Sequence, residues 1–218
     1  MNEEILKTKL VEDDIVKEIC KNYTYEFKEI YEFVKHNIKD FLPSEYNIGV
    51  IVGSSGSGKS LLLNEFGTYN KHHWDNNKAI ASHFKDYPEA VERLSGVGFN
   101  SIPMWLVPYN ILSTGQKYRV NLARSIGSGM VADEFTSVID RSTAKGLCYS
   151  LSRYIKTKGL KNIVFATVHK DIIDYLKPDW VYNTDEKSLT INDLIWDVSF
   201  DTITAKAEFV KKDHFMEL

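Results

Sequence analysis

The sequence predicts an α/β fold in which helices flank a mostly parallel central sheet. Short apolar runs have the composition of buried strands, and they cover residues 47–52, 130–132 and 162–167. Segments with the amphipathic pattern of helices separate these runs, and they cover residues 86–96, 113–126 and 142–156. Because strands alternate with helices, we expect functional side chains at the carboxyl ends of the strands.

The other segments give weaker patterns. Residues 1–22 predict a helix or an additional element before the domain. Residues 23–27 alternate aromatic and polar side chains as a half-buried strand does, and residues 30–38 fit a second strand or a short helix. Together these predict an antiparallel β element near the N-terminus. Further predicted elements are short helices at 60–66 and 171–176 and strands or a hairpin at 180–209.

Composition and charge set limits on the class of protein. The chain has 218 residues, of which 43% are hydrophobic and 26% charged, and this excludes collagen-like, coiled-coil and wholly disordered proteins. The net charge of -3 leaves no broad basic field for nucleic acid. No apolar run approaches the ~18 residues that cross a bilayer, and the acidic N-terminus is unlike a secretory signal. We therefore expect a cytoplasmic protein without a membrane segment, with Cys20 and Cys148 as two buried thiols.

The domain organisation follows from the same composition, because no low-complexity linker divides the chain. We expect a single domain over residues 1–218. Within it we expect an N-terminal extension at 1–22, a small helical subdomain at about 68–128 and a C-terminal strand or helix extension at 186–218.

A glycine-rich segment follows the first buried strand and precedes a helix. It fits the pattern G-x-x-x-x-G-K-[ST], in which backbone N–H groups surround phosphate oxygens. Lys59 can neutralise the β and γ phosphates, and the Ser60 hydroxyl can bind Mg²⁺. The alternative is a Gly/Ser turn that binds nothing. The predicted nucleotide-binding residues here are Gly53, Ser54, Ser55, Gly56, Ser57, Gly58, Lys59, Ser60 and Leu61.

A second segment places small residues before a helix. Its residues are Leu112, Ser113, Thr114, Gly115 and Gln116, leading into a helix that reaches Ile126. A helix start with small residues can donate backbone and hydroxyl hydrogen bonds to an anion. The alternative is an ordinary helix that Ser113 caps.

A third segment is an apolar strand that ends in the carboxylates Asp133 and Glu134, 20 residues after Ser113. The three segments in this order resemble the P-loop, LSGGQ-like signature and Walker B motifs of ABC-type ATPases, with Thr114 in place of the usual glycine. Residues 137–140 resemble the D-loop of that family, and Val168-His169 resembles its switch histidine. The resemblance covers about residues 23–185.

This resemblance implies an enzyme that hydrolyses ATP with Mg²⁺ as a head-to-tail homodimer, with two nucleotides between the subunits. It assigns Mg²⁺ to Ser60 and Asp133, and catalysis to Lys59, Glu134 and His169, where Glu134 activates the attacking water. From the other subunit, the nucleotide would meet the signature residues Ser113, Thr114, Gly115 and Gln116, and Asp140 of the D-loop is also assigned to nucleotide binding.

Three shorter sequence segments resemble a soluble, non-transporter branch of the family. That branch occurs in bacteria and phages and is sometimes fused to an acetyltransferase-like domain. The residues that carry this likeness are 105–109, 133–141 and 177–180. Only 53 residues separate Lys59 from Ser113, which implies a shortened helical subdomain and disfavours transport. Gln116 is the only glutamine, so the family's other conserved Gln is missing, and Ser82 or His83 is a candidate substitute.

Several alternatives stay open at this point. The functional classes are a mechanochemical ATPase acting on a protein or nucleic-acid partner, a nucleotide-gated switch of phage or defence systems, and the ATPase subunit of a transporter. Adenine could stack on an upstream tyrosine, although each of these more often packs in a core: Tyr23, Tyr25 or Tyr31. Two further groups could bind metal and phosphate respectively, or be solvated: His72, His73 and His83, and Lys156, Lys158 and Lys161.

Overall fold

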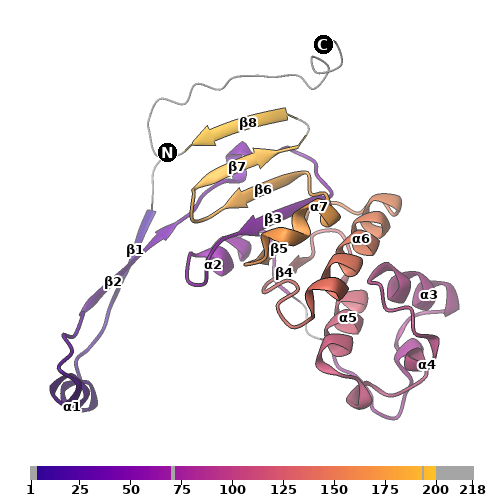
Figure 1. Ribbon diagram of the computed structural model, residues 1–218, viewed down its shortest axis with the longest axis horizontal. Helices are drawn as coiled ribbons and strands as arrows, with labels where there is room; N and C mark the ends of the chain where they lie inside the picture. The colour runs from indigo at the N-terminus through magenta and orange to yellow at the C-terminus, as the bar shows by residue number, and fades with distance from the viewer. Residues whose placement is uncertain (1–3, 70–71, 193, 200–218) are drawn as a thin grey trace. The chain divides into compact units, whose positions relative to one another are not determined.

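Figure 1 shows the computed structural model, which describes residues 4–69, 72–192 and 194–199. Contacts divide the chain into an N-terminal unit that ends at Asp40 and a larger unit that starts at Phe41. The larger unit has a six-stranded sheet in the order β4-β5-β3-β6-β7-β8. The first four of these strands are parallel to one another, and β7 and β8 continue the sheet in antiparallel pairing. The predicted α/β fold with a mostly parallel sheet is thus confirmed.

The N-terminal unit contains β1 (Glu4–Lys9), α1 (Asp14–Tyr23) and β2 (Ile30–Lys35). The two strands pair antiparallel from Glu4↔Lys35 to Lys9↔Ile30, which confirms the predicted antiparallel element. The prediction of a strand at 23–27 is wrong. Tyr23 ends α1, and Thr24 follows it in the left-handed conformation, with φ 52°. Because Tyr23 and Tyr25 are 78% and 77% exposed, their alternation reflects a solvated turn and not a sheet face.

The centre of the sheet is β3 (Ile48–Val52), whose five residues are all buried. It lies between β5 (Ile163–Thr167) and β6 (Trp180–Asn183), and β4 (Val131–Ala132) pairs with β5. Val52 is opposite both Thr167 and Asn183 in the parallel register. The residues that follow these strands therefore emerge at one edge of the sheet.

The described part of the larger unit also contains six α-helices. They are α2 (Lys59–Leu63), α3 (Tyr87–Gly96), α4 (Ile102–Trp105), α5 (Thr114–Ser125), α6 (Arg141–Thr157) and α7 (Ile173–Leu176). Of these, α3, α4 and α5 lie to one side of the sheet with α6 (Figure 1). Single 3₁₀ turns are η1 (Lys39–Phe41), η2 (Ile80–His83), η3 (Tyr109–Ile111) and η4 (Lys170–Ile172). Among the described residues, no helix is long and apolar enough to cross a membrane.

Two helices differ in length from the sequence prediction. The helix predicted at 60–66 ends at Leu63, because Glu65 N and Phe66 N bond to carbonyls three residues back and tighten the chain into a turn. The helix predicted at 171–176 begins as the turn η4 and is α-helical only from Ile173.

The main core cluster joins β3 and β5 to α6 and extends to α3 and α5. Buried side chains of α6 recur at helical spacing, at Ala144, Leu147, Cys148, Leu151 and Ile155. Cys148 is buried as predicted, whereas Cys20 is only half-buried because the short helix α1 has no fully buried residue.

The C-terminal prediction is met in part. Strands β7 (Ser188–Ile191) and β8 (Leu194–Ser199) form the predicted hairpin. The rest of the predicted C-terminal extension, residues 200–218, lies outside the described residues.

Candidate nucleotide-binding site

The segment after β3 forms a loop that leads into α2. Gly56 and Gly58 have φ angles of 79° and 89°, a conformation that glycine adopts without the strain of a side chain. A Cβ added to Gly53 would lie 2.0 Å from Thr184 Oγ1, so a larger residue would collide with the turn after β6. Backbone path and packing thus require the three glycines of the predicted phosphate-binding loop.

Lys59 is the cation of this loop. Its side chain is buried, at 9% exposed, and its Nζ donates to Ser54 O at 2.5 Å. Among the described residues, Lys59 forms no salt bridge with a carboxylate. A buried ammonium without a direct carboxylate contact is costly, and an anion bound in the loop would offset that cost. The loop therefore suits a phosphate group.

The turn after β6 supports the loop from the outside. The Asp185 carboxylate accepts hydrogen bonds from Ser54 N at 2.8 Å and from Ser54 Oγ at 2.7 Å. Ser57 Oγ and Thr184 Oγ1 lie 2.6 Å apart. Donation by Ser54 holds the pKa of Asp185 below its usual range. Sequence analysis missed Thr184 and Asp185, although both directly follow a parallel strand, where functional side chains are expected.

Ser60 and Asp133 meet across this edge of the sheet. Ser60 Oγ donates to Asp133 Oδ2 at 2.5 Å, although 73 positions separate the two residues. The other carboxylate oxygen, Asp133 Oδ1, accepts from Glu134 N at 2.8 Å. A hydroxyl beside a carboxylate is an oxygen donor set of the kind that Mg²⁺ prefers. The two predicted Mg²⁺ ligands are thus adjacent and chemically suited to that ion.

The loop after β4 turns sharply at Glu134. Glu134 has φ 47° and is exposed, whereas the next residue, Phe135, is fully buried against Phe165 with 4.1 Å between ring centroids. Phe135 N also donates to Ala166 O at 2.8 Å. The buried ring therefore anchors the loop to β5, and the Glu134 carboxylate remains on the solvent side.

His169 follows β5 at the same edge of the sheet. The backbone N–H of His169 donates to Thr167 Oγ1 at 3.1 Å, and the Thr167 hydroxyl donates to Phe135 O at 2.8 Å. Partial burial, and to a lesser degree the charge of Arg141, hold the pKa of His169 below its usual value. The imidazole is therefore neutral at neutral pH and can accept or donate a hydrogen bond.

Arg141 links the loop after β4 to the segment that follows His169. Its Nη2 and Nε contact the two oxygens of Asp171 at 2.6 Å and 3.3 Å, and its Nη1 donates to Thr136 Oγ1 at 3.3 Å. The neighbouring Asp140, a predicted nucleotide ligand, caps α6 by accepting from Thr143 N at 2.9 Å. Asp140 is exposed, and its pKa is lowered by the hydrogen bonds from Thr143.

The signature segment forms a capping box at the start of α5. Gln116 N donates to Ser113 Oγ at 3.4 Å, and Ser113 N donates to Gln116 Oε1 at 2.9 Å. Ser113 and Thr114 are exposed, and a Cβ on Gly115 would lie 3.0 Å from Ile139 Cγ2. Figure 1 shows α5 and α2 well apart in the view. The structure thus brings together the phosphate-binding loop and the acidic strand end at Asp133. The signature residues Ser113 and Gln116 are bonded to each other.

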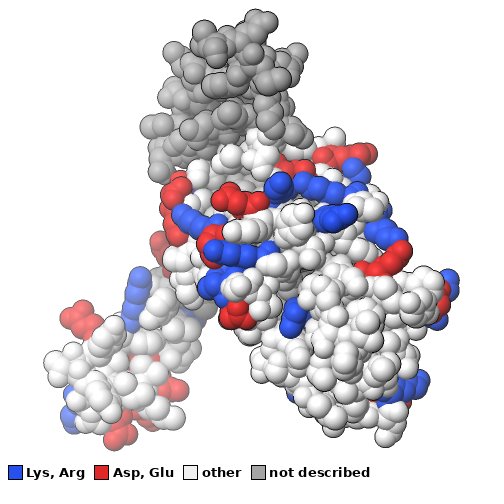
Figure 2. Space-filling model, turned by 45° about the vertical axis from the view of Figure 1, so that its right-hand side comes forward, with Lys and Arg blue, Asp and Glu red and all other residues white. Residues whose placement is uncertain are grey.

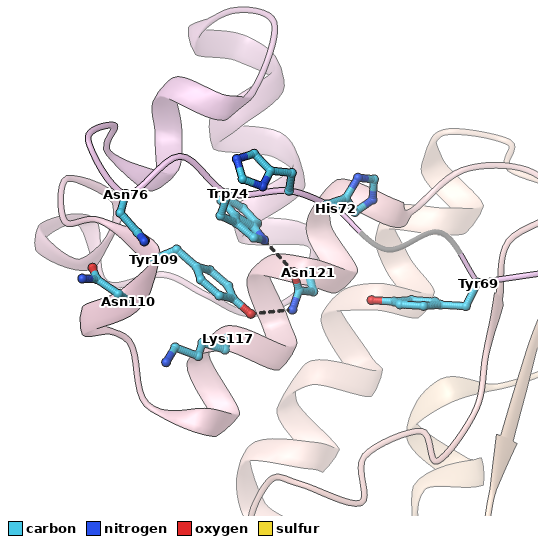
Figure 3. Close-up of a pocket in the computed structure, with 9 residues that line it drawn as sticks. Tyr69, His72, Trp74, Asn76, Tyr109, Asn110, Lys117 and Asn121 are labelled. Carbon is cyan, nitrogen blue, oxygen red and sulfur yellow. Dashed lines mark hydrogen bonds between the residues drawn. The ribbon is translucent and has the colours of Figure 1, made fainter.

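A cavity of about 560 Å³ is lined by Lys117 and Asn121 of α5 and by residues of the segments that precede this helix in the chain (Figure 3). Trp74 stacks on Tyr109 with 4.9 Å between centroids, and Asn121 bonds to both, accepting from Trp74 Nε1 and donating to the Tyr109 hydroxyl. The Tyr69 hydroxyl points toward this group from the opposite side (Figure 3). The residues around the cavity are polar or aromatic, and none of those that line it is acidic.

Two of the three histidines predicted as possible metal ligands, His72 and His83, have other partners. His83 Nε2 accepts from Asp75 N, and its Nδ1 lies 2.9 Å from Ala79 O. His72 Nε2 lies 3.0 Å from Ser125 Oγ. Within the described ranges, no cluster of three metal-binding side chains occurs. Because both ring nitrogens of His83 are engaged, the exposed Ser82 is the freer of the two candidate substitutes for the missing glutamine.

The predicted lysine cluster is largely paired. Lys158 and Lys161 contact Glu92 at 2.7 Å and Glu45 at 3.7 Å, and Lys156 Nζ donates to Lys177 O at 2.9 Å. Acidic and basic side chains also lie side by side on the face that Figure 2 shows, and the helical part at its lower right carries few charges. These observations favour a solvated helix end over a phosphate-binding patch.

For the remaining predicted site residues, the structure gives a position in the fold and does not test the predicted role. In the phosphate-binding loop, Ser55 is exposed and Leu61 is 44% exposed. Tyr23, Tyr25 and Tyr31 belong to the N-terminal unit, where Lys28 Nζ lies 5.4 Å from the ring centroid of Tyr31. A role for any of these tyrosines in adenine stacking stays a prediction.

No protein-family model and no curated protein matches the sequence. Among solved structures, a dimeric structure of MJ0796, a bacterial ABC transporter cassette, is 17% identical, with a TM-score of 0.51 over 72% of this chain and 88% of that chain. A dimeric post-hydrolysis state of the same cassette bound to ADP and Pi is 15% identical, with a TM-score of 0.48 over 73% and 89% of the two chains. At this identity the first likeness shows the fold alone, which is that of ABC ATPase cassettes.

Proposed function

We propose that this chain binds and hydrolyses ATP as an ABC-type ATPase. The observation that carries the proposal is the contact of Ser60 with Asp133 at 2.5 Å, which joins the phosphate-binding loop to the acidic strand end. Glu134, His169 and the buried ammonium of Lys59 belong to the same edge of the sheet. Anion binding, metal binding and water activation can therefore take place side by side.

Each residue has a distinct task in this proposal. Lys59 and the backbone of the loop bind the phosphates. Mg²⁺, held by Ser60 Oγ and the Asp133 carboxylate, would neutralise phosphate charge. The exposed Glu134 carboxylate takes the proton of the attacking water, and the neutral His169 ring orients that water by a hydrogen bond.

The proposal includes a head-to-tail homodimer. Ser113, Thr114 and Gly115 form a small-residue helix start on the twelve-residue helix α5, away from α2 in Figure 1. In an antiparallel pair of chains, this start would face the nucleotide of the other chain and donate to its phosphates. Gln116 and Asp140 would adjoin that nucleotide as well.

We further propose a cytoplasmic, non-transporter role with a protein or nucleic-acid partner, in bacteria or phages. Two sequence features support this role: the short segment of 53 residues between Lys59 and Ser113, and the sequence of residues 105–109. The net charge of -3, with mixed charge on the face in Figure 2, favours a local patch for any nucleic-acid contact. A nucleotide-gated switch with weak turnover is the second candidate, and the exposed, fully capped signature supports it because the site of a lone chain is incomplete.

Glu134→Gln tests the proposal. The amide cannot take the water proton, so we expect turnover to fall by at least about 100-fold while ATP binding persists and a dimer accumulates in size-exclusion chromatography. Glu92→Gln, at an exposed ion pair far along the chain, is the matched control and should behave as wild type. Negligible wild-type turnover with ATP-dependent dimerisation would favour the switch. A Glu134→Gln chain that stays monomeric with ATP would contradict the dimer.

A further inference from the structure

Thr136, two residues after Glu134, is held in a strained conformation. Its φ is 69°, in the left-handed region, and its side chain is fully buried. A β-branched residue rarely adopts this conformation, which is strained and persists only when neighbouring groups impose it. The groups that hold Thr136 in this backbone conformation therefore also fix the path of the loop that carries Glu134.

Two side chains from different elements hold Thr136. The Tyr118 hydroxyl, on the second turn of α5, accepts from Thr136 N at 3.1 Å. Arg141, at the start of α6, donates from Nη1 to Thr136 Oγ1 at 3.3 Å. A shift of α5 along its axis would move the Tyr118 hydroxyl and release a buried backbone N–H, which is costly to leave without a partner.

The same guanidinium extends the connection to the segment after His169. Its fork on Asp171, with contacts of 2.6 Å and 3.3 Å, is bidentate and therefore directional. A continuous series of contacts thus runs from the signature helix through Thr136 and Arg141 to the histidine segment of the same chain.

We propose that Tyr118, Thr136, Arg141 and Asp171 form a positioning relay through which the signature helix sets the geometry of Glu134 and His169 in its own chain. This inference rests on the proposed function, because the signature would contact the nucleotide of the partner chain. Each bound nucleotide then influences hydrolysis at the other site, so the two sites hydrolyse ATP cooperatively. The four residues are positioning residues and touch no reacting atom.

Tyr118→Phe tests the relay, because it removes one hydroxyl and keeps the ring. We expect wild-type turnover to rise with ATP concentration with a Hill coefficient above 1. In Tyr118→Phe we expect a coefficient of 1 and about tenfold lower kcat, the effect of one unsatisfied buried N–H. Tyr154→Phe, which removes a half-buried hydroxyl of α6, is the matched control and should keep both wild-type values.

A double-mutant cycle separates a relay from general destabilisation. Tyr118→Phe and Asp171→Asn act on opposite ends of the series, so the double variant should have nearly the kcat of the worse single variant. Losses that multiply would overturn the relay, and so would a wild-type coefficient of 1 or an unchanged coefficient in Tyr118→Phe. A wild-type chain that neither hydrolyses ATP nor dimerises would overturn the proposed function itself, and the relay with it.

Discussion

The strand-edge site and the signature segment are built in different ways. At the sheet edge, residues far apart in the chain contact one another, as Ser60 and Asp133 do across 73 positions. In the signature segment, the bonds of Ser113 and Gln116 span three positions and cap only their own helix. The first region is assembled within one chain, whereas under the proposed function the second would meet its ligand in another chain. The comparison supports two half-sites that complete each other between chains.

The largest effect expected from a change in the strand-edge site is that of Lys59→Ala. This change removes the buried ammonium that would neutralise phosphate charge, so ATP turnover should fall by about 100-fold or more. Thermal stability should fall only slightly, because within the described part of the chain the lost ammonium forms no salt bridge and its hydrogen bond is the one to Ser54 O. The measurement is phosphate release at saturating Mg²⁺ and ATP, with a melting curve beside it. Turnover within threefold of wild type would show that Lys59 is not part of the site.

Mixing two inactive chains tests whether the half-sites are shared. Ser113→Arg blocks the signature and leaves the phosphate-binding loop intact, whereas Lys59→Ala does the reverse. In an equal mixture about half of the dimers are mixed, and each has one intact composite site, so activity should return to about a quarter of wild type if the two sites act independently and to less than that if they are coupled. Each chain alone is the control. A mixture no more active than its components would contradict the shared site.

The sequence predicts the sheet and its edge well because each signal is local. The runs at 47–52 and 162–167 are continuous and apolar, as strands buried on both faces must be, and they correspond to β3 and β5. The motif pattern likewise predicts that Ser60 and Asp133 belong together, and they do.

Contacts that depend on which strands become neighbours could not be predicted in this way. Asp185 reaches Ser54 only because β6 pairs with β3, and no local pattern states that pairing. The contact of Arg141 with Asp171 likewise depends on how α6 and η4 pack. The error at residues 23–27 has a different cause, because alternating aromatic residues fit an exposed turn as well as a strand, and Thr24 ends the helix there.

Asp185→Asn should have a moderate effect on the strand-edge site. Two effects oppose each other: the loop loses a charge-assisted contact, and the phosphates lose a nearby negative charge. Charge-assisted hydrogen bonds contribute about 1.5–3 kcal/mol, whereas the repulsion from an exposed, solvent-screened carboxylate is about 1 kcal/mol or less. The loss of the contact should win, so KM for ATP should rise about threefold to tenfold with little change in kcat. Glu186→Gln is the control at the next position, and a lower KM in Asp185→Asn would reverse this assignment.

The smallest effect concerns pH and tests the neutral state of His169. Burial lowers its pKa in the folded chain, so the unfolded chain takes up a proton first as the pH falls below about 6.5. The stabilisation linked to His169 is therefore complete above that pH and decreases as the pH falls through the lowered pKa. His72 has a pKa lowered by burial as well and adds to the same trend. Urea unfolding at pH 7.5 and 5.5 should show a smaller loss of stability in His169→Gln than in wild type, with His72→Gln measured beside it. An unchanged loss in His169→Gln would mean that the ring is protonated or solvated in the folded chain and is not the neutral partner that the water would need.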